Sequence, residues 1–99
     1  MNLTGTSLRI AIVDDDPIFH YVCKVHLQHI DPKLEILDFS NGQEAFDYVQ
    51  KHENFPERIP QVFLVDINMP VMNGWELVDH MNALQLLESR DLYIVSSSI

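Results

Sequence analysis

The chain has 99 residues, which is enough for one domain, and 46% of them are apolar, so it can build a hydrophobic core. There are 15 acidic and 6 basic residues, and the net charge of −9 argues against a surface that binds nucleic acid or anionic lipid. An acidic excess suits a divalent cation or a basic partner instead. No apolar run approaches the roughly 20 residues of a membrane span and no signal-peptide core is visible, so we expect a cytoplasmic protein.

The first strand and the first helix are marked by a change of apolar pattern. Leu8–Val13 is a β-branched run that predicts a strand, and three aspartates follow it. A helix is expected to start at Pro17, whose fixed φ suits a first turn, with Asp16 as its N-cap and Asp31-Pro32 as its end. Its apolar face is given by the i, i+4, i+7 spacing of Ile18, Val22 and Val25.

A second strand and a second helix follow. Leu34–Phe39 predicts the strand. The helix starts within Ser40–Glu44, where capping-box spacing fits either of two pairs, Ser40 with Gln43 or Asn41 with Glu44. The segment His52–Pro60 contains two prolines and mixed charge, and it is predicted to be a loop.

The last predicted elements complete an alternating order. Gln61–Val65 predicts a third strand that ends at Asp66, and Leu92–Val95 predicts a fourth strand that is followed by Ser96. A third helix between them is indicated by Leu77, Met81 and Leu84. The order is therefore β-α-β-α-β-α-β. Apolar strands separated by helices are typical of an α/β protein with a doubly wound parallel sheet and right-handed crossovers.

The predicted strands end in polar groups that should meet. Asp14 and Asp15 follow the first strand, Asp66 follows the third and Ser96 follows the fourth. Parallel strands bring these ends to one edge of the sheet, where α/β proteins bind ligands. A single acid after a strand is usually a loop or capping residue, but acids on two strands and a hydroxyl on a third favour a site.

Carboxylates that converge repel one another. Two unit charges ~4 Å apart cost about 4 kcal/mol at an effective dielectric of ~20. The stretches Asp14–Asp16 and Asp66–Gly74 contain no Lys or Arg, so protonation or a cation must relieve the repulsion. Oxygen ligands with spare coordination positions suit Mg²⁺. A carboxylate beside Mg²⁺ can attack phosphorus, and the Ser96 hydroxyl could then donate a hydrogen bond to the phosphoryl group.

Two segments carry a family resemblance. Val13–Pro17 (VDDDP) and Val65–Gly74 (VDINMPVMNG) resemble the receiver domain of two-component response regulators, the CheY-like family. The second segment is the more specific, because an aspartate after an apolar strand is followed by Met-Pro and then by Gly. The resemblance covers Leu8–Ile99 and leaves residues 1–7 as an N-terminal tail. It implies a flavodoxin-like parallel sheet with strand order 2-1-3-4, truncated after the fourth strand.

The resemblance also implies a role for each residue of the predicted site. Asp66 matches the phospho-accepting aspartate of the family. Asp15 would bind Mg²⁺ directly, Asp14 mainly through water, and Asn68 through its backbone carbonyl. Ser96 matches the switch hydroxyl that moves towards the phosphoryl group. The loop after the phosphorylation site would be shaped by Met69, Pro70 and Gly74.

The chain departs from the family pattern at its C-terminal end. Receiver domains usually continue with a helix, a fifth strand that carries a lysine, and a last helix, whereas this sequence stops at Ile99. Leu92–Val95 would then be an apolar strand at an exposed edge, which is prone to pair with another chain. We therefore expect either a fragment of a longer regulator or a homodimer completed by exchange or by pairing of the fourth strand.

The function implied by the resemblance is a phosphorylation-dependent switch, with no enzymatic activity beyond self-phosphotransfer and autodephosphorylation. Its partners would be a sensor histidine kinase or a histidine phosphotransfer protein, and a downstream protein of unknown identity. A first alternative is a Mg²⁺-dependent phosphohydrolase, because Asp14-x-Asp16 resembles the D-x-D of haloacid dehalogenase-like phosphatases, although Ile18 stands where that motif has Thr or Val. A second alternative is a non-phosphorylated interaction module, which the missing lysine favours.

Other chemically active side chains have simpler interpretations. His20, Cys23 and His26 are spaced three apart, so successive members are offset by about −60° around a helix and should not meet at one zinc ion. The single cysteine also excludes an internal disulfide. Trp75 is expected either to pack at the start of the third helix or to belong to a surface for a partner.

Overall fold

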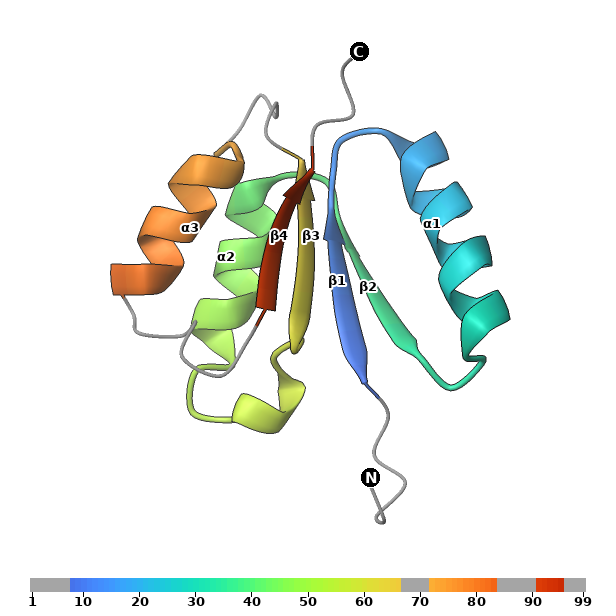
Figure 1. Ribbon diagram of the computed structural model, residues 1–99. Coiled ribbons are helices and arrows are strands. Elements are labelled where there is room, and N and C mark those ends of the chain that lie inside the picture. Colours follow the sequence, from blue (N-terminus) through green and yellow to red (C-terminus); the bar gives the residue numbers. More distant parts are fainter. Residues whose placement is uncertain (1–7, 67–71, 84–90, 96–99) are drawn as a thin grey trace.

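Four parallel strands form one sheet in the computed structural model, which describes residues 8–66, 72–83 and 91–95 (Figure 1). The strand order is β2-β1-β3-β4, so the order predicted from the sequence is confirmed. The strands are β1 (Arg9–Val13), β2 (Glu35–Phe39), β3 (Val62–Asp66) and β4 (Asp91–Val95). They alternate with α1 (Pro17–Ile30), α2 (Gly42–Lys51) and α3 (Gly74–Ala83), and a short 3-10 helix, η1 (Pro56–Arg58), precedes β3.

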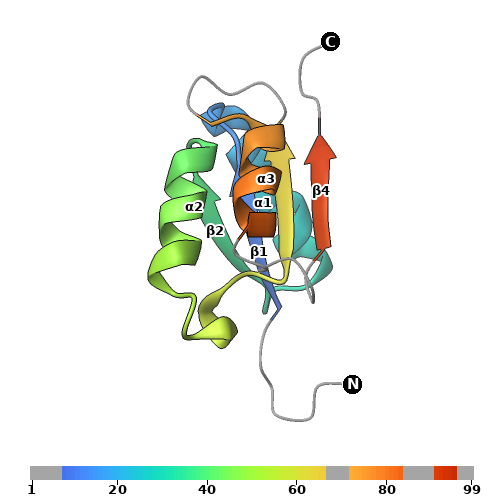
Figure 2. The same ribbon diagram turned by 90° about the vertical axis from the view of Figure 1, so that its left-hand side faces the viewer.

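The helices lie on both sides of the sheet. Figure 1 shows α2 and α3 together on one side of the sheet and α1 on the other, and Figure 2 shows the sheet face-on, with α2 and α3 in front of it and α1 behind. We call the side of α2 and α3 the packed face, and the opposite side the α1 face. The predicted doubly wound α/β architecture is therefore confirmed. No helix within the described ranges combines the length and the apolar character that a membrane crossing needs.

The packed face contains the main hydrophobic core. Because successive side chains of a strand point to opposite sides, alternate residues of β1 and β3 face α2 and α3. All of these core side chains are fully buried, and they include Ala11, Val13, Phe63, Val65, Ala45, Val49, Leu77 and Met81. Burial of this apolar surface fixes α2 and α3 against the two central strands.

The α1 face is covered more thinly. Ile10 and Ile12 of β1 are buried without belonging to the core cluster of the packed face. The range predicted for the first helix is confirmed, yet none of its 14 residues is buried. Ile18 keeps 71% of its surface exposed and Val25 keeps 48%. Of the helices in the described residues, α1 covers this side of the sheet, whereas α2 and α3 cover the other (Figure 1).

Polar side chains fix where each helix begins. The Asp16 carboxylate accepts a hydrogen bond from the backbone N–H of Ile18, as predicted for an N-cap. At α2 the two capping alternatives are decided in favour of Asn41, whose side chain accepts a hydrogen bond from the Glu44 N–H at 2.9 Å. At α3 the side chains of Asn73 and Glu76 each accept a hydrogen bond from the other residue's backbone N–H, which is a complete capping box.

One predicted boundary is corrected by the structure, and another lies outside the described residues. The segment predicted as a loop, His52–Pro60, contains η1, because Pro56 suits the first position of a helical turn. Leu84, which was expected in the third helix, lies outside the described residues. β4 forms one edge of the described sheet, and dimerisation through this edge or by exchange stays a prediction.

Candidate metal site at the carboxyl edge of the sheet

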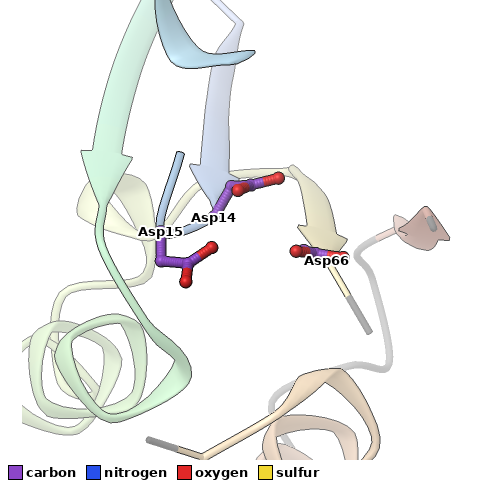
Figure 3. Close-up of side chains that lie close together, drawn as sticks. All are labelled: Asp14, Asp15 and Asp66. Atoms are coloured by element: carbon purple, nitrogen blue, oxygen red, sulfur yellow. The ribbon is translucent and has the colours of Figure 1, made fainter. Parts of the chain in front are cut away.

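Three carboxylates converge at the carboxyl ends of β1 and β3. Each of Asp14, Asp15 and Asp66 offers one oxygen, and these oxygens lie within 4.8 Å of one another (Figure 3). The register explains the arrangement, because Val13 of β1 pairs with Val65 of β3, and an aspartate follows each of them. The predicted meeting of acids from two distant segments is therefore confirmed.

Asp14 is the most constrained of the three acids. Its side chain is 1% exposed, and its Oδ1 accepts a hydrogen bond from the Asp16 N–H at 2.8 Å. Its Oδ2 is buried and has no hydrogen-bond partner among the described residues. Burial raises the pKa of Asp14, and the charges of Asp66 and Asp15 add to this increase, whereas the Asp16 N–H opposes it. A bound cation would remove both the repulsion and the unmet acceptor.

The other two acids complete a site with one open side. Asp66 is 4% exposed at the end of β3, whereas Asp15 is exposed at the start of the connection to α1. A pocket of about 450 Å³ opens on the side of Asp14 and Asp15, and its lining consists of Asp14, Asp15, Pro17, His20, Asp38 and Ser40. The donors are all oxygens, and part of the coordination sphere stays accessible to water, as Mg²⁺ requires. The residues present therefore fit this ion.

The remaining predicted site residues are only partly within the described chain. Asn68, Met69, Pro70 and Ser96 lie outside the described residues, and their roles stay predictions. Gly74 is buried and forms the first residue of α3.

A contact that the sequence analysis missed holds the start of α3 to α2. The Gly42 N–H donates a hydrogen bond to the Met72 carbonyl oxygen at 3.1 Å. Met72 has a φ of 49°, in the left-handed region that non-glycine residues seldom adopt. A Cβ atom at position 42 would collide with that same carbonyl oxygen, so the approach requires glycine.

A second missed feature lies beside Asp14. The His20 ring contacts the Asp14 carbonyl oxygen through Nε2 at 2.6 Å and the Asp38 carboxylate through Nδ1 at 2.8 Å. Lys24 donates to the other Asp38 oxygen at 2.6 Å. Burial alone would raise the pKa of Asp38, but the hydrogen bonds from Lys24 and His20 hold it below its ordinary value of 3.8. The sequence could have indicated this shared contact, because the i, i+4 spacing of His20 and Lys24 puts both side chains on one face of α1.

The candidate zinc ligands on α1 do not come together. His20 is engaged with Asp14 and Asp38, while the Nδ1 of His26 contacts the carbonyl oxygen of Val22 in its own helix. Burial raises the pKa of the Cys23 thiol, and the charge of Asp14 raises it further. The thiol therefore stays protonated near neutral pH.

The fold and the acidic edge define an α/β protein of the flavodoxin-like, CheY-like class. Residues 10–98 match the family described as the response regulator receiver domain. The chain belongs to this receiver domain family of two-component signalling. A crystal structure of a two component response regulator from Cytophaga hutchinsonii has a TM-score of 0.82 at 26% identity and covers 95% of this chain and 71% of its own.

Segments similar to this chain occur in known proteins of different lengths. A chemotaxis protein CheY homolog of Campylobacter jejuni is 29% identical over 90 residues, which are 91% of this chain and 65% of the relative. A protein-glutamate methylesterase/protein-glutamine glutaminase of Pyrococcus abyssi is 37% identical over 75 residues, but these cover only 18% of that protein. The chain thus spans less than two thirds of each of these relatives. The enzymatic name of the second therefore does not transfer to this chain.

Proposed function

We propose that this chain is a phosphorylation-dependent switch in which Asp66 accepts a phosphoryl group with Mg²⁺ bound at the acidic cluster. The convergence of Asp14, Asp15 and Asp66 at one edge of the sheet carries the proposal. The buried Oδ2 of Asp14, which has no hydrogen-bond partner among the described residues, supports it, because burying a charge without a partner is costly.

The described acids and one predicted ligand would share the ion. Asp15 and Asp66 would bind Mg²⁺ directly, Asp14 mainly through water, and Asn68 through its backbone carbonyl. When bound, the ion neutralises charge on the oxygens of the transferring group. The pocket beside Asp14 and Asp15 leaves room for a donor next to the cluster.

The proposed chemistry is an in-line transfer to Asp66. A carboxylate oxygen of Asp66 attacks phosphorus, the bond between phosphorus and the nitrogen of a phosphohistidine breaks, and the donor imidazole leaves with the electron pair. The product is an aspartyl phosphate, to which the Ser96 hydroxyl would donate a hydrogen bond. The added charge would bias the surface that a downstream protein recognises.

The donor would be a sensor histidine kinase or a histidine phosphotransfer protein, and the proposal places this chain with it in the cytoplasm. The phosphohydrolase alternative needs the Asp16 carboxylate beside Asp14 in the site. That carboxylate caps α1 through the Ile18 N–H instead. We therefore favour the switch over an enzyme whose catalysis depends on an Asp14-x-Asp16 pair.

Labelling with a small phospho-donor tests the proposal. With acetyl phosphate and Mg²⁺, the whole chain should gain one acid-stable, base-labile phosphoryl group, detected by mass spectrometry. Asp66→Asn should abolish the label, whereas Asp79→Asn, an exposed aspartate on α3, should keep it. Labelling that survives in Asp66→Asn, or that proceeds equally after chelation of Mg²⁺, would overturn the proposal. An unlabelled but folded parent chain would favour the interaction module.

A further inference from the structure

We infer that His20 is a positioning residue that holds the connection between β1 and α1 in the geometry that binds the divalent cation. The inference rests on the proposed function of the acidic cluster. His20 does not touch the cluster carboxylates; it contacts the backbone that carries two of them. Its proposed role is therefore to orient Asp14 and Asp15.

The ring of His20 is fixed at both ends. Its side chain is 13% exposed on the first turns of α1, between the Asp14 carbonyl oxygen and the Asp38 carboxylate. Both of these partners are oxygen acceptors, so each ring nitrogen faces an acceptor. Both nitrogens are therefore in contact with protein oxygens, which separates His20 from the metal ligands themselves.

Asp38, the residue that contacts the Nδ1 side of the His20 ring, belongs to the sheet. Asp38 lies in β2, where it pairs with Ile12 of the neighbouring strand β1. Its second oxygen accepts a hydrogen bond from Lys24, one turn further along α1 than His20. The carboxylate is therefore held by two donors from one helix, and it ties that helix to the strand.

The backbone around Asp14 is held from two sides. The Asp14 N–H donates to the Phe39 carbonyl oxygen of β2 at 3.0 Å, and the Asp14 carbonyl oxygen accepts from His20 at 2.6 Å. That carbonyl belongs to the peptide bond between Asp14 and Asp15. Its orientation therefore decides where both carboxylates point, because rotating this peptide would move the two side chains relative to Asp66.

This restraint matters because the three carboxylates repel one another. Without a donor on the Asp14 carbonyl, the connection can relax so that the acids separate, and a cation must then pull them back together. Partners that orient ligands without touching the metal commonly change its affinity by about 10- to 100-fold, and an effect through the backbone belongs at the lower end.

The test is a titration of Mg²⁺ into the whole chain, followed by isothermal titration calorimetry. His20→Phe keeps an aromatic ring and removes both donors, and it should raise the Kd for Mg²⁺ about tenfold. His20→Arg supplies several N–H donors and should restore the affinity to within about threefold of the parent. His26→Phe is the matched control, because His26 is exposed and its ring contacts the Val22 carbonyl oxygen of its own helix.

A double-mutant cycle with Asp38→Asn tests whether Asp38 acts through His20. Asp38→Asn alone should weaken Mg²⁺ binding, and it should add little once His20→Phe is present. A purely structural role would lower the stability of His20→Phe to urea and leave the Kd of the folded fraction unchanged. It would also give no recovery in His20→Arg.

The outcomes separate this inference from the proposed function. If the parent chain itself shows no saturable Mg²⁺ binding that Asp66→Asn weakens, the proposed site fails. If the parent binds and His20→Phe binds equally well, the positioning role is overturned and the site stands. Equal weakening in His26→Phe overturns it too. Should His20→Phe fail to fold, Asp38→Asn decides, and an unchanged Kd in that variant contradicts the inference.

Discussion

The two faces of the sheet are held by different kinds of interaction. On the packed face, fully buried side chains such as Val49, Leu77 and Met81 close α2 and α3 onto the strands. On the α1 face, the helix has no buried residue, and the side-chain hydrogen bonds of Asp16, His20 and Lys24 fix it to the connection after β1 and to β2. The acidic cluster lies at the carboxyl ends of β1 and β3, the central strands that both sides cover. Asp66 belongs to β3, whereas Asp14 and Asp15 follow β1, where hydrogen bonds with Asp16 and His20 hold the chain.

The largest expected effect on stability comes from the closest backbone approach on the packed face. Gly42→Ala puts a methyl group against the Met72 carbonyl oxygen, so the backbone must shift. Overpacking of this kind should lower the free energy of unfolding by about 3 kcal/mol. Urea denaturation followed by circular dichroism measures this change. Gln50→Ala, at an exposed position of the same helix, should change it by less than about 0.5 kcal/mol. An equally small effect for both variants would show that position 42 has room for a methyl group beside the Met72 carbonyl oxygen.

A matched pair of valines compares the faces directly. Val49 on α2 is 0% exposed and Val25 on α1 is 48% exposed. Val49→Ala should lower the free energy of unfolding by about 2 kcal/mol, because two buried methyl groups are lost and a cavity remains. Val25→Ala should cost less than about 0.5 kcal/mol. The same denaturation experiment measures both, and equal costs would show that the two faces are packed alike.

Without a bound cation, the acidic cluster should lower the free energy of unfolding of the chain. Asp14 is buried beside two other acids, with one oxygen unpartnered among the described residues. In the presence of a chelator, Asp14→Asn should raise the free energy of unfolding by about 1 kcal/mol, because an unpaired buried charge is removed. The same variant should lose affinity for Mg²⁺. A loss of stability in chelator would mean that the Asp14 carboxylate is already well compensated.

The dependence of stability on pH sharpens the comparison, because Asp14 and Asp38 shift in opposite directions. The pKa of Asp14 is raised above 3.8 in the folded chain, so its destabilising effect is present near neutral pH and fades as the pH falls through the folded-state pKa towards 3.8. The pKa of Asp38 is lowered, so its stabilising effect persists down to pH 3.8 and is lost below that value. The stability difference between parent and Asp14→Asn should therefore shrink at a higher pH than the difference between parent and Asp38→Asn. The reverse order would contradict the assigned environments.

Much of the fold could be predicted because its signals are local. The β-branched run Leu8–Val13 and the capping aspartate Asp16 lie within their own elements, and the alternation of strands and helices limits the topology. The meeting of Asp14 with Asp66 was also predictable, since parallel neighbouring strands bring their carboxyl ends to one edge. No contact between individual side chains was needed for these conclusions.

The contacts that refine the site could not be predicted in the same way. The bond from His20 to Asp14 and Asp38 depends on how α1 lies over β2, which no local pattern encodes. The approach of Gly42 to Met72 likewise depends on how the start of α2 meets the connection before α3. The choice of Asn41 over Ser40 as the cap was open because both pairs have the required spacing. Tertiary placement decided the contacts of His20 and Gly42.

The most direct test of the central claim is a crystal structure of the chain grown with Mn²⁺, an anomalously scattering substitute for Mg²⁺. The account predicts one strong anomalous peak between Asp15 and Asp66, at roughly 2.0–2.2 Å from a carboxylate oxygen of each, with Asp14 close by. A peak bound elsewhere, or ordered acids at this edge of the sheet with no ion between them at saturating Mn²⁺, would contradict it.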